Sequence, residues 1–461
     1  MKALHDPDRL LGEGLAAIRA QFRVPDSFPP AVLAAAERAA QRLPSAHADW
    51  TAREFVTLDP ASSTDLDQAF AIEAAGADYL LHYAIADVAW FVDDDDPVDQ
   101  EAWRRGVTTY LPDGKAGLYP PVLAEGAASL LPDGPRPAVV FTTRVAPDGG
   151  AVLDGVTRAV IRSRAKLAYD TARDDQLPPA LPDLAARIAA AEDRRGAARV
   201  DPPEQEVDRT NDGRYALRFR PPLRSETRNA ALSLATNMAV ADLLHAHGTG
   251  LFRVMAAPDD FAVARLRQTA HAFNLHWPDA LPLARFEKTL NPADPRDGAF
   301  MLAIRRAGQG ASYEPFQPGT TPWHAAMAAT YAHATAPLRR LADRYVIRAA
   351  LAVANGQPVP AVVSAAFTRL PTVMGKADAR AGQVERAVVD LAETAILAGR
   401  EGEHFAAVVT DLGETGARFQ LCDLPVVART PAQDVVPGAA IRVRLDAADP
   451  ARRTLAFTRT E

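Results

Sequence analysis

The sequence predicts a mixed α/β (α+β) fold built from three parts. Apolar residues recur at helical spacing near the N-terminus, β-branched strands and long helices fill the middle, and short alternating strands end the chain. A length of 461 residues is enough for two to four domains. We therefore expect a small helical module over residues 1–48, a large α/β domain over 49–400 and a C-terminal all-β barrel over 401–461.

The N-terminal module contains two short predicted helices. The apolar stripe of the first consists of Leu10, Leu11, Leu15, Ile18 and Phe22. An alanine-rich segment after two consecutive prolines at 29–30 predicts the second helix. Two arrangements remain open, a helix-turn-helix-like module and a helical cap packed on the next domain.

The large domain begins with strands and continues with helices. The segment EFVTLD (54–59) is apolar and β-branched, and residues 69–88 form two predicted strands around a turn at Gly76. Long helical patterns follow over about 228–247, 259–273 and 325–353. This mixture predicts an α/β domain.

The last part of the chain changes to short alternating strands. They are HFAAVVTDL (404–412), GARFQLCD (416–423), AIRVRLDAA (440–448) and RTLAFTR (453–459), separated by Gly, Pro and Asp. This pattern is typical of a small β-barrel, and the OB-fold is the common barrel of this size.

Composition restricts the functional classes. The formal net charge of −7 argues mildly against a protein that coats nucleic acid over its whole surface, although an acidic metal site can offset a basic channel. A single cysteine, Cys422, excludes a disulfide framework and fits a reducing cytoplasm. No apolar run approaches the ~18 residues of a membrane span, so we expect a cytoplasmic protein without a membrane partner.

An aspartate cluster is the most informative motif. The segment DPASSTDLDQA (59–69) places Asp59, Asp65 and Asp67 within nine residues, directly after a predicted strand. Carboxylates crowded this closely repel one another unless a cation lies among them, and Mg²⁺ prefers carboxylate oxygens. A solvated acidic turn is the alternative. An EF-hand calcium loop would need a glycine and a terminal glutamate that are missing here.

Five segments in this order resemble the RNase II (RNB) family of exoribonucleases and together cover about residues 50–400. They are FVTLDPASSTDLDQAF (55–70), HYAIADVAWFVDDDDPVDQEAWRRGVTTYLPDG (82–114), SRAKLAYD (163–170), YAHATAPLRRLADRYVIR (331–348) and VER (384–386). The resemblance implies an RNB-type catalytic domain that hydrolyses single-stranded RNA from the 3′ end to nucleoside 5′-monophosphates. It also implies two Mg²⁺ ions as cofactors, with Mn²⁺ as a substitute.

The resemblance assigns roles to individual residues by their place in these motifs. The implied metal and catalytic residues are Asp59, Asp65, Asp67 and, at the scissile phosphate, Arg339, with position 68 as a further metal ligand. The implied RNA-binding residues are Tyr110 stacking near the last bases, Tyr169 beside the 3′-terminal nucleotide, Arg339 on phosphate, Glu385 on ribose, and Arg340.

The chain departs from the family at several positions. Gln68 replaces the fourth aspartate, so we expect an uncharged amide ligand and weaker binding of one metal rather than an inactive enzyme. Ala336 replaces a serine next to the arginines. The N-terminal segment is helical where the family has two cold-shock domains, from which we expect altered tolerance of structured RNA. Neither a protein partner nor an oligomer is indicated, and a monomer is expected.

Two other functions compete with the exoribonuclease. Gln68 is compatible with an RNA-binding protein of the same fold that has lost catalysis. A metal-dependent phosphodiesterase acting on DNA or a small nucleotide is the other. The retained aspartates and Arg339 favour an enzyme, and Glu385 and Tyr110 favour RNA.

Overall fold

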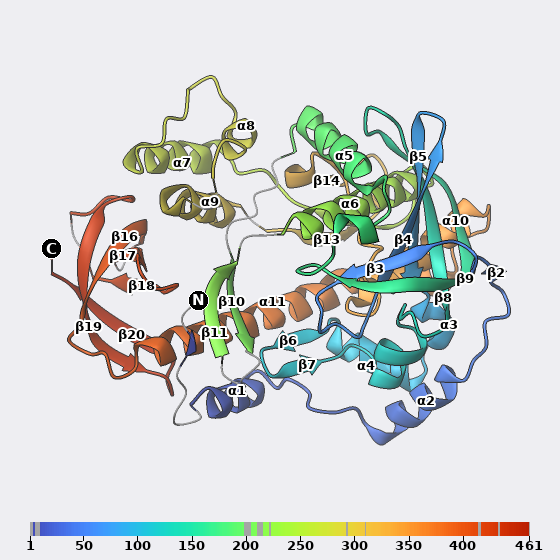
Figure 1. Cartoon of the computed structure of the whole chain (residues 1–461), viewed down its shortest axis with the longest axis horizontal. Helices are drawn as coiled ribbons and strands as arrows, with labels where there is room; N and C mark the ends of the chain where they lie inside the picture. Colours follow the sequence, from blue (N-terminus) through green and yellow to red (C-terminus); the bar gives the residue numbers. More distant parts are fainter. Residues whose placement is uncertain are drawn as a thin grey trace.

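The computed structural model describes residues 3–4, 10–197, 204–209, 215–220, 223–291, 294–308, 310–413, 416–431 and 434–460. Figure 1 shows a large domain of strands and helices and, at the other end of the molecule, a small β-domain that contains the C-terminus. The long helix α11 (Ala361–Leu397) runs between the two. The mixed α/β fold class with a C-terminal all-β domain is confirmed.

Six strands form the main sheet of the large domain, in the order β2-β9-β3-β4-β5-β8. Their bounds are β2 Ala48–Asp49, β3 Phe55–Asp59, β4 Gln68–Ala75, β5 Asp78–Ala86, β8 Pro135–Val145 and β9 Ala151–Ala168. β9 pairs antiparallel with β8 along most of its length, and its last residues pair parallel with β3. The strands β9, β3, β4, β5 and β8 therefore close into a ring. Gly76, at φ 68°, makes the expected turn between β4 and β5.

Helices pack around this ring. α6 (Arg224–Ala246) and α10 (Leu341–Ala354) contact β9 and each other. The other helices of the large domain are α3 Val88–Phe91, α4 Pro97–Arg105, α5 Leu181–Arg195, α7 Asp260–Ala272, α8 Leu283–Glu287 and α9 Pro295–Ala307. Within the described ranges, no helix is both long enough and apolar enough to span a bilayer.

Several short strands complete the large domain. They are β1 Ala3–Leu4, β6 Thr109–Leu111, β7 Gly114–Ala116, β10 Glu204–Arg209, β11 Tyr215–Arg220, β12 Leu251–Val254, β13 Ser312–Pro315, β14 Trp323–His324 and β15 Ala329–Thr330. They form β-hairpins or small sheets outside the ring.

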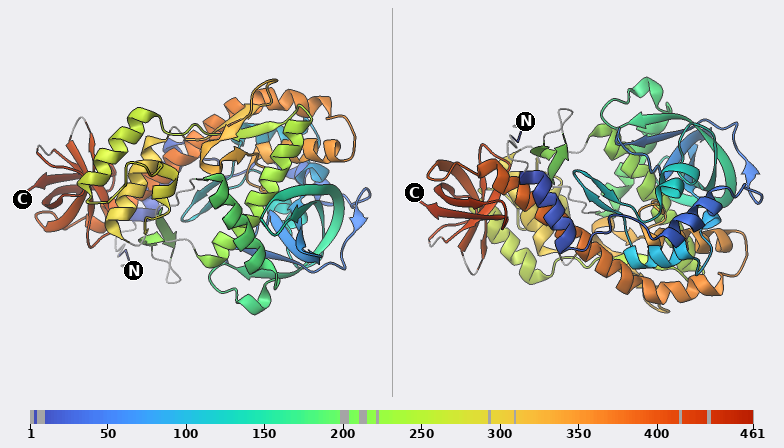
Figure 2. Two further views of the ribbon diagram at one scale, coloured as in Figure 1. Left: turned by 90° about the horizontal axis from the view of Figure 1, so that it is seen from above. Right: turned by 90° about the horizontal axis from the view of Figure 1, so that it is seen from below.

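The two N-terminal helices pack on different parts of the large domain. Leu15 and Ile18 of α1 (Leu10–Gln21) share one apolar core with residues of α11, and Figure 2 shows α1 lying along that helix. α2 (Pro30–Ala40) packs on α4 and on the short π-helix Leu123–Ala127. Of the two arrangements left open above, this packing corresponds to the helical cap.

The helix expected over 325–353 is wrong in its first half, because α10 begins only at Leu341. Pro337 lacks a backbone N–H and disfavours the helical conformation of the residue before it. The chain here also directs its backbone groups to side chains. The Ala336 N–H, for example, donates to Asp343 Oδ2 at 2.8 Å.

The C-terminal domain is a five-stranded antiparallel sheet in the order β18-β17-β16-β19-β20. Its strands are β16 His404–Gly413, β17 Gly416–Leu421, β18 Val427–Thr430, β19 Ala440–Asp449 and β20 Thr454–Arg459. The hydroxyl of Thr430 on β18 donates to the carbonyl of Phe457 on β20 at 3.0 Å, which brings the two edge strands together. The sheet is therefore nearly a barrel, and only β18 was not among the predicted strands.

Candidate active site

The aspartate motif forms a loop between β3 and β4. Leu66 is fully buried, its N–H donates to Ser129 Oγ at 2.9 Å, and its carbonyl accepts from the Leu130 N–H at 3.0 Å. The loop is thus fixed to the core through Leu66. The side chains of all three aspartates line one cavity of about 570 Å³. The structure therefore brings together the three aspartates that the sequence singled out.

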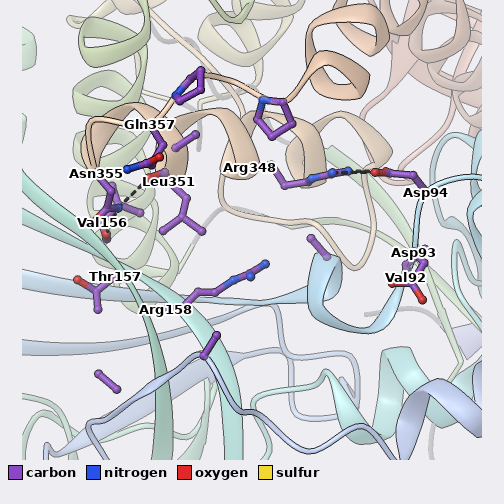
Figure 3. Close-up of a pocket in the computed structure, with 16 residues that line it drawn as sticks. Val92, Asp93, Asp94, Val156, Thr157, Arg158, Arg348, Leu351, Asn355 and Gln357 are labelled. Carbon is purple, nitrogen blue, oxygen red and sulfur yellow. Dashed lines mark hydrogen bonds and ion pairs between the residues drawn. The ribbon is translucent and has the colours of Figure 1, made fainter.

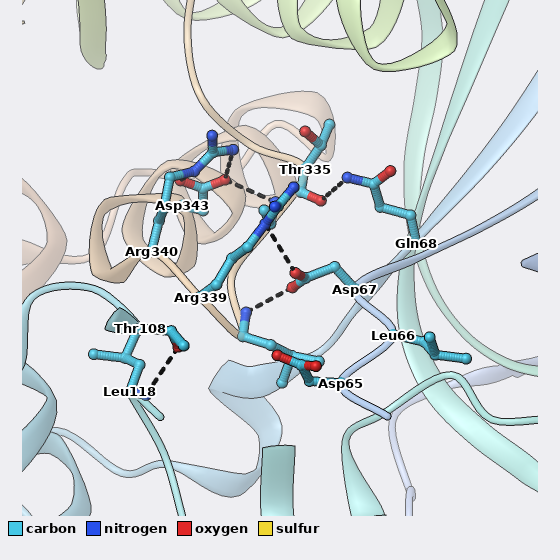
Figure 4. A network of polar contacts seen from close by, with 12 residues as sticks. Asp65, Leu66, Asp67, Gln68, Thr108, Leu118, Thr335, Arg339, Arg340 and Asp343 are labelled. Carbon is cyan, nitrogen blue, oxygen red and sulfur yellow. Dashed lines mark hydrogen bonds and ion pairs between the residues drawn. The ribbon is translucent and has the colours of Figure 1, made fainter. Parts of the chain in front are cut away.

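Asp67 is the most deeply buried of the three. Its Oδ1 accepts a hydrogen bond from the Leu338 N–H at 2.7 Å, and its Oδ2 lies 3.5 Å from Nε of Arg339 (Figure 4). Burial raises the pKa of Asp67 to about 8, although the Arg339 guanidinium acts in the opposite direction. The surrounding protein therefore does not fully compensate the cost of burying this charge.

Asp59 ends β3 at the same cavity. Its Oδ2 is buried and has no hydrogen-bond partner among the described residues. Burial raises the pKa of Asp59 to about 6, and Arg339 again opposes the shift. A buried carboxylate oxygen without a donor is costly unless a cation or a water binds it.

Asp65 is held by the β6–β7 hairpin. Tyr110 and Lys115 are directly opposite each other in this hairpin. Lys115 Nζ lies 2.6 Å from Asp65 Oδ1, and the Tyr110 hydroxyl donates to Oδ2 at 3.3 Å. Sequence reasoning missed Lys115. The signal that points to it is the Pro-Asp-Gly turn after Tyr110, which predicts a tight hairpin and hence a residue opposite the tyrosine.

Arg339 and Arg340 precede α10 but differ in their surroundings. The Arg339 side chain is 49% exposed and lines the cavity, where it can reach a phosphate. Arg340 also lines the cavity, but its guanidinium forms two hydrogen bonds with Asp343, at 3.0 and 2.7 Å. Its charge is therefore already balanced by a carboxylate, and its predicted contact with RNA stays a prediction.

A glycine supports the backbone of this arginine segment. Gly106 follows α4 at φ 75°, and its carbonyl accepts from the Leu341 N–H at 2.9 Å. A Cβ at this position would lie 2.6 Å from Cβ of Ala377 on α11. Only glycine therefore allows α4, α10 and α11 to meet behind Arg339.

One face of α6 forms the opposite wall of the cavity. Its lining residues are Glu226, Asn229, Ala230, Ser233, Leu234 and Asn237. The amide of Asn229 donates to the hydroxyl of Tyr169 at 2.9 Å, and burial raises the pKa of Tyr169 to about 12. Sequence reasoning missed Asn229, Ser233 and Asn237 of this face. The signal is their recurrence every three or four residues in a helix.

Two other predicted residues lie apart from this arrangement. Glu385, on α11, lines a different pocket of about 400 Å³ near the C-terminal domain, together with arginines that include Arg386 and Arg418. Gln68 lines the aspartate cavity, but its Nε2 donates to the Thr335 carbonyl at 2.6 Å and its Oε1 accepts from the Tyr83 hydroxyl. The ribose role of Glu385 and the metal role of Gln68 stay predictions.

Another cavity, of about 760 Å³, lies between α10, β9 and the segment around α3 (Figure 3). Both of its arginines are paired. Arg348 contacts Asp94 at 2.5 and 2.9 Å, and Arg158 contacts the buried Asp87 at 2.8 Å. Because these charges are already balanced, we place the candidate site at the aspartates.

Two models of known protein families match the chain. The family model described as "RNB domain" matches residues 47–355, more than half of the chain. The chain belongs to the RNB family. A second model, "RNase II-type exonuclease C-terminal S1 domain", matches residues 403–460.

Individual RNB relatives are distant in sequence. Ribonuclease R of Aquifex aeolicus is 26% identical over 433 residues, which are 87% of this chain and 60% of that protein. Exoribonuclease 2 of Cronobacter sakazakii is 29% identical over 412 residues, 83% of this chain and 62% of that protein. The chain thus spans about 60% of the length of these relatives.

A solved structure shares the fold. RNase R of Mycoplasma genitalium, in complex with ribose-methylated single-stranded RNA, superposes with a TM-score of 0.87 at 19% identity, over 100% of this chain and 79% of that chain.

The RNB site fits a divalent cation in an open geometry. Among the residues that the structure describes, no three Asp, Glu, His or Cys side chains converge closely enough to hold a metal by themselves. Mg²⁺ usually binds through one or two carboxylates and completes its shell with waters and substrate phosphate. The partnerless oxygen of Asp59 and the buried carboxylate of Asp67 are suitable ligands for such an ion.

Proposed function

We propose that this chain is a hydrolytic 3′-to-5′ exoribonuclease that degrades single-stranded RNA to nucleoside 5′-monophosphates. The proposal includes Mg²⁺ as the cofactor, Mn²⁺ as a substitute, and action as a cytoplasmic monomer. The observation that carries it is the meeting of three aspartates and a half-exposed Arg339 in one cavity of an RNB-family chain. The names of its relatives, Ribonuclease R and Exoribonuclease 2, support it.

The aspartates would hold two divalent ions in this proposal. Asp59 and Asp67 are the principal ligands because burial leaves their carboxylates without compensating charge, and Asp65 joins them at the Lys115 side of the cavity. When bound, such ions activate a water and stabilise charge on the leaving oxygen. Arg339 donates to the phosphate and neutralises charge that develops in the transition state.

Aromatic side chains would hold the RNA without reading its sequence. Tyr110 is 51% exposed on the β6–β7 hairpin, and Tyr169 lies deeper in the same cavity. Bases of any identity stack on such rings. Glu385 lines a different pocket, so a contact between it and ribose would involve a nucleotide outside the aspartate cavity.

The test uses 5′-labelled single-stranded RNA and DNA of the same sequence, each with Mg²⁺ or EDTA. We expect a ladder that shortens from the 3′ end only on RNA, only with Mg²⁺, and only with an intact Asp67. Asp67→Asn should be inactive. Asp133→Asn, at an exposed carboxylate paired with Arg136, is the matched control and should behave as wild type. RNA binding without shortening would contradict the proposal and support the RNA-binding alternative.

Altered tolerance of structured RNA belongs to the same proposal. Hairpins with 3′ tails of graded length, incubated with the full chain, test it. Digestion that continues into the stem would support tolerance of structure. A stop at a fixed tail length before the stem would contradict it.

A further inference from the structure

Gln68 bridges the start of β4 and the segment that carries the catalytic arginine. Its side-chain nitrogen lies 2.6 Å from the carbonyl oxygen of Thr335. A carbonyl can only accept hydrogen bonds, so the nitrogen end of the amide must face it. The oxygen end accepts from the hydroxyl of Tyr83, a fully buried residue of β5 that also contacts Ser233 at 2.7 Å.

The segment held in this way, residues 331–340, has no regular helix or strand to fix it. Side chains hold it at two neighbouring points on the β4 side. Gln68 binds the Thr335 carbonyl, and Asp67 accepts from the Leu338 N–H at 2.7 Å. Arg339 comes directly after Leu338, so both contacts lie within four residues of it (Figure 4).

We propose that Gln68 is a positioning residue, which holds the 331–340 segment and with it Arg339 against Asp67. The consequence for catalysis rests on the proposed function, whereas the consequence for the order of the segment does not. In this role Gln68 differs from the neighbouring aspartates, which are proposed to bind metal. A carboxylate at position 68 would bind a cation better than an amide does, but an ionised carboxylate cannot donate to the Thr335 carbonyl and would be repelled by it.

Two substitutions distinguish a positioning residue from a metal ligand. Gln68→Met keeps the length of the side chain but removes both the donor and the ligand. Gln68→Glu removes the donor and supplies a stronger ligand. Gln100→Met is the matched control, because Gln100 also donates to a backbone carbonyl, that of Asp95 at 2.9 Å, but at an exposed site away from the cavity.

Hydrogen–deuterium exchange of the full chain, without RNA or divalent ions, measures the segment directly. Peptides covering 329–340 should exchange at least about threefold faster in both Gln68 variants and at the wild-type rate in Gln100→Met. Tyr83→Phe, which loosens the amide but leaves the Thr335 contact, should give a smaller increase and serves if Gln68→Met does not fold. Unchanged exchange in the folded variants would overturn the proposal.

Kinetics at saturating Mg²⁺ add the catalytic readout. Loss of the Gln68 donor to the Thr335 carbonyl should lower kcat roughly tenfold or more in both Gln68 variants, with KM for RNA changed by less than about threefold. A Gln68→Glu variant as active as wild type, or more active, would show a metal ligand and overturn the proposal. A wild type that does not shorten RNA would refute the proposed function instead, and the exchange result would still decide the role of Gln68.

Discussion

Replacing Asp67 with asparagine should make the cation-free protein more stable at alkaline pH. Burial raises the pKa of this carboxyl from 3.8 to about 8, so the folded protein binds its proton more tightly than the unfolded chain does. A raised folded-state pKa contributes stability that is fully present below about pH 4 and is lost as the pH rises through 8. Asparagine keeps an oxygen for the Leu338 N–H and never ionises.

The size of the expected change in the free energy of unfolding follows from the same pKa. The rise from 3.8 to about 8 corresponds, at about 1.36 kcal/mol per pKa unit, to an upper limit of about 6 kcal/mol. We expect the free energy of unfolding of Asp67→Asn, relative to wild type, to increase steadily between about pH 4 and pH 8 and then to level off. Urea denaturation in EDTA across that range measures it.

Stabilisation by Mg²⁺ should also differ between wild type and Asp67→Asn. At pH 8 the ion should stabilise wild type more than Asp67→Asn, because it compensates a charge that only wild type has. A stability difference that does not change with pH, or a wild type that is the more stable protein at pH 9 without metal, would show that burial does not raise the pKa of Asp67.

Three further predictions concern the other side chains of the cavity. Arg339→Ala should lower kcat roughly 100-fold with a smaller change in KM, which steady-state kinetics on RNA would measure. If Arg339→Lys loses as much activity as Arg339→Ala, the geometry of the guanidinium matters and not its charge alone. Tyr110→Ala should weaken binding of single-stranded RNA roughly 5- to 100-fold in fluorescence anisotropy, whereas Tyr110→Phe, which keeps the ring, should bind as wild type. Lys115→Met should bind Mn²⁺ several-fold more tightly in electron paramagnetic resonance titrations, because the positive charge 2.6 Å from Asp65 competes with the ion. Lys115→Arg keeps this charge and should bind Mn²⁺ as wild type does.

Local sequence patterns predicted the elements whose residues depend mainly on their neighbours in the chain. The turn at Gly76, with alternating strands on each side, and the alternation of buried residues in β17 are examples. The aspartates were predicted to lie together because one short loop contains them. The aspartates are so close in the sequence that they lie near one another almost whatever the fold.

Contacts between distant segments could not be predicted in this way. Residues 331–340 have a helical pattern of apolar residues, and Pro337 is the local signal against a helix. The hydrogen bonds to Asp67 and Gln68, more than 260 residues away, have no such signal in the sequence. The pairing of Lys115 with Asp65 depends on how a hairpin packs against a loop. The pocket that Glu385 lines could not be predicted either, because its motif does not indicate where this part of α11 lies relative to the aspartates.

The first product released shows directly whether this chain is a 3′-to-5′ exoribonuclease that depends on Asp67. RNA labelled in its 3′-terminal nucleotide is mixed with wild type or Asp67→Asn in Mg²⁺, and the labelled species are identified by mass spectrometry within the first turnovers. We expect wild type to release the label at once as a nucleoside 5′-monophosphate and Asp67→Asn to release none. Label that appears first in oligonucleotides or as a free nucleoside, or equal release by Asp67→Asn, would be incompatible with this reaction.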